Sequence, residues 1–397
     1  MKTAGDVREQ IRQALKDLHD KAIDLSLDLH RHPELSMREE YAAGRLKAWL
    51  AAEGFEVESP VAGLDTAFVA RVGNGDRPRV AYLLEYDALP EIGHACGHNL
   101  IAAGGLAAAT ALHRALPDPD GTLLVIGTPG EEGGGGKITE LDAGVFEGVD
   151  AALMFHPGDR TWPWRHATAI AHLSVKFHGK AAHAAGNPGA GRNALSAMLQ
   201  FFSSVDALRQ HVPESARLHG VITHGGAAPN IIPDYTEAAY LVRALTQEGT
   251  HELVERVTAC AEGAARATGT TTEVSHESPL YAERKNNKVI ASRVAEYLRG
   301  TGEDVQEPVL KGGTGSSDIG NVSLVLPSIH PYMQIVPRGT PGHSVAFRDA
   351  AGSPEGLEAM TRMAEALALA GADLLLDPEM VERAWEEFRT TGADVPD

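Results

Sequence analysis

Apolar residues recur at helical spacing through the first fifty residues of the chain. This spacing predicts two amphipathic helices, Val7 to about Leu29 and Met37 to Ala52, separated by the turn-forming segment HRHPELS. Four apolar runs of strand length come next: TAFVARV, RVAYLLEY, TLLVIGTP and DAALMFHP. A helix from Leu100 to Leu116 is predicted between the second and third runs. Apolar strands that alternate with helices indicate a largely parallel sheet with helices on both faces.

The pattern changes near Ala169, where apolar and polar residues alternate as in half-exposed strands. Helices are predicted at Asn193–Gln210 and His251–Arg266, and strands at AHLSVKFHG, RLHGVITHGG, EAAYLVRALT and TTTEVSH. Their order along the chain is strand–helix–strand–strand–helix–strand. This is the order of a ferredoxin-like α+β domain.

The first pattern returns at about Arg284. A helix is predicted at Lys288–Leu298, a strand at Ser323–Leu326 and a helix at Pro354–Leu374. We therefore expect an α/β domain made of residues 1–168 and 286–397, interrupted by a smaller inserted domain at residues 169–285. The length of 397 residues also favours two domains, because it exceeds what one hydrophobic core usually supports.

Charge and composition exclude several classes of protein. The chain has 54 Asp and Glu against 35 Lys and Arg, and a net charge of −19 argues against nucleic-acid binding. The longest apolar stretch is interrupted by Gly104 and Gly105 and falls short of the ~20 residues of a membrane span. The N-terminal segment is charged throughout and only two cysteines occur, so we expect a cytoplasmic protein with reduced thiols.

Residues of metal-ligand type follow three of the predicted strands and stand in one late Gly-Pro loop. They are Cys96, His98, Glu131, Glu132, His156 and His343. A Cys-x-His pair alone is more often structural than functional. In doubly wound sheets, however, functional crevices lie beyond the carboxyl ends of the strands, where three of these groups stand. Thiolate and imidazole both suit a metal such as zinc, so the placement predicts a metal site.

The adjacent glutamates have a use in such a site. Neighbouring side chains on an extended segment point in different directions, so one can ligate a metal while the other exchanges a proton with water. A solvated acidic turn is the alternative. The glycine tract Gly133–Gly136 weakens that alternative, since it lets backbone and substrate approach closely.

Seven motifs extend over almost the whole chain: HRHPELS, EYDALPEIGHACGHN, GTPGEEGGGG, GKAAHAAGNPGAGRNAL, HGVITHGGAAPNIIPD, GSSDIGNVS and PGHS. With these motifs the chain resembles the aminoacylase and carboxypeptidase G superfamily of two-metal metallopeptidases. Within it, the chain is most similar to the branch of p-aminobenzoyl-glutamate hydrolase, the auxin-conjugate amidohydrolases and the β-alanyl-lysine dipeptidases.

The resemblance implies a role for each candidate residue. Cys96 would bridge two metals, one of them also held by His98 and His156. The second metal would be held by Glu132 and His343. Glu131 would be the catalytic base, and Asp87 would orient the metal cluster from behind.

The resemblance also implies roles for the inserted domain, as a lid and as the surface of a homodimer. His183 would polarise the scissile carbonyl, while Asn230 and Arg243 would hold the substrate. An exposed polar histidine is the alternative for His183. His94, His178, His219 and His224 remain unassigned.

The expected activity is hydrolysis of an amide bond in a small dipeptide or an N-acyl or aminoacyl amino acid. The chain departs from the auxin-conjugate enzymes at Asn99 and Ile101, which places it nearer the dipeptidases. An amidohydrolase for N-acyl-amino acids or p-aminobenzoyl-glutamate is the alternative, and a non-catalytic metal-binding dimer is the alternative from another class. Two divalent ions are expected as cofactors: zinc first, with manganese, cobalt and nickel as alternatives.

Overall fold

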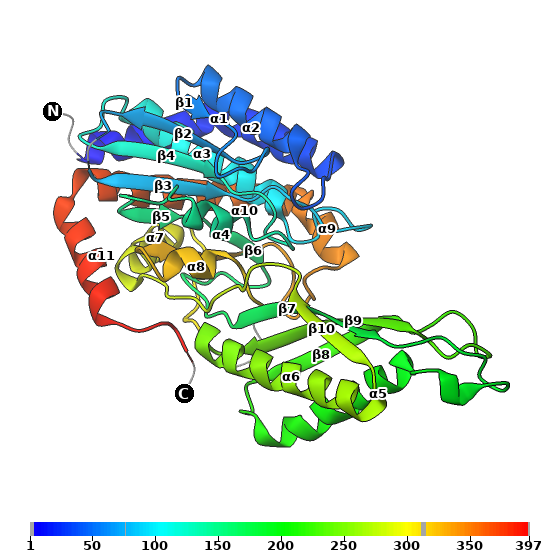
Figure 1. The fold of residues 1–397 in the computed structure, drawn as a ribbon. Helices are drawn as coiled ribbons and strands as arrows, with labels where there is room; N and C mark the ends of the chain where they lie inside the picture. The colour runs from blue at the N-terminus through cyan, green and yellow to red at the C-terminus, as the bar shows by residue number, and fades with distance from the viewer. Residues whose placement is uncertain (1–3, 76, 311–314, 396–397) are drawn as a thin grey trace. The chain divides into compact units, whose positions relative to one another are not determined.

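The computed structural model of the protein describes residues 4–75, 77–310 and 315–395 (Figure 1). The described residues form two compact units. The first contains residues 4–166 and most of the chain after residue 283, and the second contains Ala167–Glu283 with residues 315, 316 and 395.

The first unit is built on a six-stranded mixed sheet. Its strands, in sheet order, are β1 (Glu56–Glu58), β2 (Phe68–Gly73), β4 (Thr122–Gly127), β3 (Arg79–Leu84), β5 (Ala151–Leu153) and β11 (Ser328–Ile329). The four strands from β4 to β11 are parallel, with Arg79 opposite Thr122 and Val80 opposite Ala151. Strands β1 and β2 are antiparallel to their neighbours. The carboxyl ends of the parallel strands therefore meet at one edge of the sheet.

Strand β3 shows why this sheet is covered on both faces. Val80, Tyr82 and Leu84 are buried in one hydrophobic core, while Ala81 and Leu83 are buried in a second core on the opposite face. A strand buried on both sides needs the continuous apolar run RVAYLL rather than an alternating pattern.

Helices cover both faces of the sheet (Figure 1). The larger core contains residues of α1 (Ala4–Arg31), α2 (Glu40–Ala52), α3 (His98–Ala115), α7 (Lys288–Gly300), α9 (Val345–Ala351), α10 (Pro354–Leu376) and α11 (Pro378–Thr390). The smaller core is closed by α8 (Ile319–Ser323) and by residues that follow α4 (Gly136–Asp142). Two short strands, β6 (His156–Gly158) and β12 (Tyr332–Gln334), pair with each other in parallel. Among the described helices, none is both long and apolar enough to cross a membrane.

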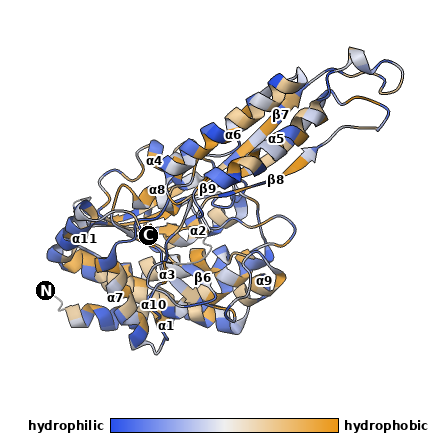
Figure 2. Cartoon of the chain, turned by 90° about the horizontal axis from the view of Figure 1, so that it is seen from below, coloured by the Kyte–Doolittle hydropathy of each residue, from blue (hydrophilic) through white to orange (hydrophobic). Residues whose placement is uncertain are grey.

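The second unit is a four-stranded antiparallel sheet with two helices. The chain order is β7 (Ala169–His178), α5 (Ala194–Leu208), β8 (Arg217–His224), β9 (Tyr235–Ala244), α6 (Gln247–Thr268) and β10 (Thr271–His276), with short 3-10 turns at Pro188–Ala190 and Arg209–His211. The sheet order is β10-β7-β9-β8. Alternate residues of β7 and β9 pack with one side of α5 and α6, and Figure 2 shows hydrophilic and hydrophobic residues side by side along α6. The unit thus has the predicted strand–helix order.

The strand predicted at Ser323–Leu326 is wrong. Helix α8 ends at Ser323, a turn follows, and the strand β11 begins at Ser328. Val322 and Leu326 are four residues apart and both are buried in the smaller core, which is helical spacing. The backbone N–H of Leu326 donates to the carbonyl of Val322, and the hydroxyl of Ser323 donates to the carbonyl of Gly320. The helical turn therefore continues where the short apolar run suggested a strand.

Candidate metal centre

The first group of candidate ligands lies where β3 leads into α3. The backbone of Gly97 adopts a φ of 78° just before α3 begins at His98. A Cβ atom at this position would lie 2.8 Å from the ring of Pro157, which follows His156. Only glycine therefore allows this turn to place Cys96 and His98 against the segment that carries His156.

Cys96, His98 and His156 form the first ligand group. Their candidate ligand atoms all lie within 4.8 Å of one another, and the Cys96 Sγ is 3.3 Å from the His156 Nε2. Two atoms that each lie 2.0–2.3 Å from one tetrahedral zinc ion are about 3.5 Å apart. The Sγ–Nε2 distance is thus close to that of two ligands of one ion.

The same thiol belongs to a second group with Glu132 and His343. The His343 Nε2 is 3.6 Å from the Cys96 Sγ and 3.5 Å from the Glu132 Oε1. His343 adopts a positive φ of 54°, and its backbone N–H donates to the carbonyl of Ala95, one residue before the thiol. This turn holds an otherwise exposed loop against the centre.

Polar groups behind the ligands fix the orientation of the imidazole rings. The Nδ1 of His98 is 2.9 Å from Oδ1 of Asp87, and the Nδ1 of His156 is 2.5 Å from the carbonyl oxygen of Pro157. Each Nδ1–H donates to its oxygen, which leaves the Nε2 atom as the ligand. The other Asp87 oxygen, Oδ2, accepts from the Glu132 backbone N–H at 2.9 Å, so Asp87 connects two of the ligand segments.

The donors that these residues present fit divalent cations. Within the described part of the chain, the buried His98 Nε2 and Glu132 Oε1 have no hydrogen-bond partner, which is costly for polar atoms unless something binds them. One thiol, three imidazoles and a carboxylate are together a ligand set typical of zinc and similar metals.

The buried Asp87 carboxylate favours positive charge at His98, which a bound cation would supply in place of a second ring proton. Burial alone would lower the pKa of His98, but the Asp87 carboxylate raises it well above its usual value. Burial alone would raise the pKa of Asp87, but the charge of His98 and its hydrogen bond lower it. Burial lowers the pKa of His156 to about 3, so this ring is neutral, as a metal ligand must be.

Glu131 lies beside this centre, near the carboxylates of Glu85 and Glu132. Its Oε2 is 3.9 Å from the His98 Nε2. Burial, followed by the charges of Glu85 and Glu132, raises the pKa of Glu131 well above its usual value. A carboxylate with high proton affinity close to the ligands is suited to accept a proton from water.

Sequence reasoning missed three charged residues beside Glu131. Glu85, Lys137 and Asp318 are fully buried, and the Lys137 Nζ contacts both carboxylates. Glu85 opens EYDALP, in which Asp87 already had a role, and Lys137 directly follows GTPGEEGGGG, in which Glu131 and Glu132 already had roles. Asp318 lies in GSSDIGNVS, in which no residue had been given a role. For Lys137, the position directly after the glycine tract was the signal in the sequence that could have identified it.

The substrate-contacting candidates lie in the second unit. The exposed His183 accepts two backbone hydrogen bonds at its Nδ1, from Ala185 at 3.2 Å and from Gly186 at 2.9 Å. The proton therefore resides on Nε2, which is free to donate. Asn230 is adjacent, because its carbonyl accepts from the backbone of Ala184 at 2.9 Å.

Arg243 is half-buried in β9, a strand that contains neither His183 nor Asn230. Its Nη1 donates to the Ser316 hydroxyl at 2.8 Å, and burial lowers its pKa. The unassigned histidines, His94, His178, His219 and His224, belong to no ligand group among the described residues.

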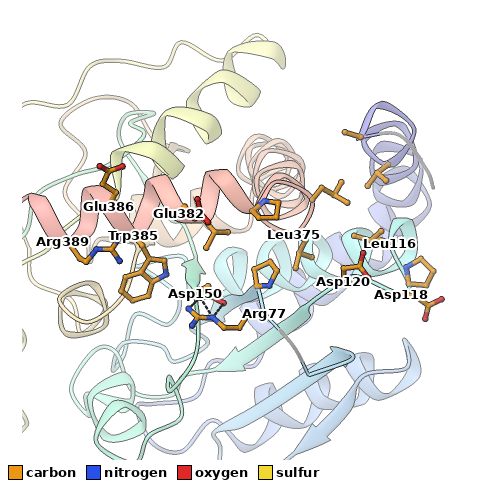
Figure 3. Close-up of a pocket in the computed structure, with 17 residues that line it drawn as sticks. Arg77, Leu116, Asp118, Asp120, Asp150, Leu375, Glu382, Trp385, Glu386 and Arg389 are labelled. Carbon is orange, nitrogen blue, oxygen red and sulfur yellow. Dashed lines mark hydrogen bonds and ion pairs between the residues drawn. The ribbon is translucent and has the colours of Figure 1, made fainter.

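A cavity of about 1760 Å³ also lies in the first unit (Figure 3). Figure 3 shows Arg77 paired with Asp150 in it, and Trp385 and Glu382 on α11. Arg77 precedes β3 and Asp150 precedes β5, so the cavity lies at the amino ends of parallel strands. The ligand groups follow the carboxyl ends of these strands. The described lining contains no candidate ligand, and the cavity is not the site of this chemistry.

Comparisons with known proteins agree with the fold and identify the family. Residues 167–268 match the family model described as a peptidase dimerisation domain. The chain is 39% identical to the Xaa-Arg dipeptidase of Mus musculus over 387 residues, which cover 92% of this chain and 88% of that protein. It is 38% identical to a p-aminobenzoyl-glutamate hydrolase polypeptide from Escherichia coli, over 68% of this chain and 58% of that protein.

Solved structures show the same fold. An aminobenzoyl-glutamate utilization protein from Klebsiella pneumoniae superimposes with a TM-score of 0.73 at 19% identity, covering 92% of this chain and 98% of that one. A dinuclear metal-binding peptidase of the M20 family from Bacillus subtilis gives a TM-score of 0.65 at 23% identity, with 90% and 99% covered.

The chain belongs to the M20 family of metallopeptidases. It is an enzyme, a metal-dependent hydrolase of amide bonds. The family, the mixed α/β fold and the hydrolase class predicted from the sequence are confirmed.

Proposed function

We propose that the protein is a two-metal dipeptidase that cleaves the amide bond of small aminoacyl dipeptides. The observation that carries this proposal is the sharing of the Cys96 thiol by two groups of candidate ligands. The 39% identity to an Xaa-Arg dipeptidase over most of the chain supports a dipeptide as substrate.

In this proposal Cys96 is common to both metals. His98 and His156 complete one site, and Glu132 and His343 complete the other. Zinc is the proposed metal, because thiolate and imidazole ligands suit it, with manganese, cobalt and nickel as alternatives. When bound, two divalent cations supply Lewis acidity and make water a stronger acid at neutral pH.

Glu131 moves the proton in this mechanism. Its carboxylate accepts a proton from the attacking water and later delivers it to the leaving amine. The Nε2–H of His183 donates to the carbonyl oxygen as negative charge develops there. Arg243 would bind the substrate carboxylate through its planar pair of donors, with Asn230 as a further polar contact.

A substrate panel tests the proposed class. Purified enzyme supplied with zinc, manganese or cobalt is assayed on dipeptides with a C-terminal arginine or lysine, on p-aminobenzoyl-glutamate and on N-acetyl amino acids. We expect the highest kcat/KM on a dipeptide, by at least about tenfold, equivalent to ~1.4 kcal/mol in transition-state binding.

The outcomes of the panel separate the candidates. Preference for N-acetyl amino acids or p-aminobenzoyl-glutamate would replace the dipeptidase by the second candidate, which is supported by the 38% identity to the p-aminobenzoyl-glutamate hydrolase polypeptide. Two bound metals without turnover of any amide in the panel would contradict the assignment of substrates altogether.

We also propose that the second unit forms a homodimer. It matches a peptidase dimerisation domain, and β8 is one of the two outer strands of its described sheet. On β8 the side chain of Val221 is 63% exposed, and Leu199 on α5 is 54% exposed. Open strand edges with exposed apolar side chains are typical association surfaces.

Both cysteines are free thiols, and the cytoplasmic location stays a prediction.

Val221→Arg tests this surface. A charged side chain buried in a dimer interface is costly, so we expect the variant to sediment as a monomer at concentrations where the wild type is dimeric. Val325→Arg is the matched control, because Val325 is 46% exposed in the first unit and should leave the dimer intact. A Val221→Arg variant that remains fully dimeric would exclude this part of β8 from the interface.

A further inference from the structure

Three carboxylates converge behind the metal centre. Glu85, Glu131 and Asp318 each offer an oxygen, and these oxygens all lie within 4.8 Å of one another. The residues come from three segments: Glu85 directly follows β3, Glu131 lies in the loop after β4, and Asp318 directly precedes α8. Glu85 and Asp318 are fully buried, and Glu131 is 8% exposed. Such a cluster requires a compensating positive charge, because isolated buried carboxylates are strongly unfavourable.

Lys137 supplies that charge. Its Nζ donates to the Glu85 Oε1 at 2.5 Å and to the Asp318 Oδ1 at 2.8 Å. Its backbone N–H also donates to the other Asp318 oxygen, at 3.1 Å. The whole side chain is buried, so the ammonium has given up water for these carboxylates.

The Lys137 ammonium donates to only one of the two Glu85 oxygens, Oε1, in the described structure. Within the described structure, the buried Glu85 Oε2 has no hydrogen-bond partner. It lies 3.6 Å from the Nε2 of His98, the atom proposed to ligate a metal. Several carboxylate oxygens around one point, with no sulfur or nitrogen donor, form a ligand set for a hard divalent cation such as Mn²⁺ or Mg²⁺.

We propose that the Lys137 ammonium fills a third cation position beside the metal centre and so limits the centre to two divalent ions. The inference rests on the proposed two-metal function. A lysine suits this role because its ammonium is a compact charge that cannot exchange with solvent metal. Removing the Lys137 side chain would leave space for a divalent ion among the carboxylates. It would also remove the positive charge that compensates them.

Lys137→Ala tests the inference by metal content. Wild type and variant are first loaded with zinc, then titrated with Mn²⁺, and bound manganese is measured by electron paramagnetic resonance and elemental analysis. Zinc should keep the sites with sulfur and nitrogen ligands, because it binds them more tightly than manganese does. We expect two zinc and no retained manganese in the wild type, and two zinc and one manganese in the variant.

Two control variants make the test specific. Lys137→Ala combined with Asp318→Asn removes one carboxylate, and we expect it to retain no manganese. Glu140→Gln changes a buried carboxylate that lies on α4, as Lys137 does, but is outside the cluster, and it should behave as the wild type.

The remaining outcomes are also decisive. A folded Lys137→Ala variant with two zinc and no manganese would overturn the inference. If this variant unfolds alone but refolds with one equivalent of Mn²⁺, the inference is supported. If it stays unfolded with Mn²⁺ while the double variant folds, it is overturned. Wild type that binds fewer than two metals would instead contradict the proposed function.

Discussion

Replacing Glu131 with glutamine is expected to abolish most turnover while both metals remain bound. The amide keeps the size of the carboxylate but cannot accept a proton from water. Loss of a general base typically lowers kcat by roughly 100- to 10,000-fold. The measurement is kcat on the best substrate of the panel together with metal content per chain, and KM should change little because the base does not hold the substrate.

The Glu140→Gln variant is the control for this experiment. Glu140 is also a buried glutamate that follows β4, but it lies outside every candidate ligand group in the described structure. Its loss should leave kcat within a fewfold of the wild type. Near-normal turnover in Glu131→Gln would refute the base assignment. Loss of a metal in this variant would instead make Glu131 a ligand, since it also groups with His98 and Glu132.

Replacing Cys96 with alanine is expected to remove both metals, whereas His343→Ala removes only one. The thiol belongs to both ligand groups, so its loss weakens two sites at once. Metal content measured after dialysis should fall from two per chain to below one in Cys96→Ala. It should fall to about one in His343→Ala. Activity should be lost in both variants.

The second cysteine provides the matched control. Cys260 lies on α6 in the other unit and belongs to no candidate ligand group among the described residues. Cys260→Ala should therefore keep two metals and full activity. If Cys96→Ala loses only one metal, the thiol is a ligand of a single site and not a bridge.

The candidate ligands could be located from the sequence because their positions follow local rules. Cys96 and Glu132 stand after strands whose apolar runs are unambiguous, and parallel strands bring their carboxyl ends to one edge. His156 stands after the next predicted strand, so the same argument places it at this edge. The structure brings these residues together, and their separate metal roles stay a proposal.

The predictions from the sequence failed in two situations. In one, an apolar run was too short to identify its secondary structure; in the other, a buried charged residue stood beside a residue that already had a role. Val322 and Leu326 have helical spacing, but a run of four residues cannot distinguish a helical turn from a strand. Glu85 was hidden by its neighbour Asp87, which already had a role. Nothing local indicates that Lys137 would meet Glu85 and Asp318, which are 52 and 181 residues away.

The sequence by itself determined the α/β order, the inserted α+β unit and the residue types of the centre, because hydrophobic periodicity and strand-end placement are local properties. The family resemblance implied that Cys96 is shared, and the tertiary structure places its thiol in two ligand groups. Only the tertiary structure showed that Lys137 is enclosed by carboxylates. These contacts depend on which buried side chains from distant segments meet within a few ångströms. Packing of the whole first unit sets those distances, and no single segment of the sequence contains them.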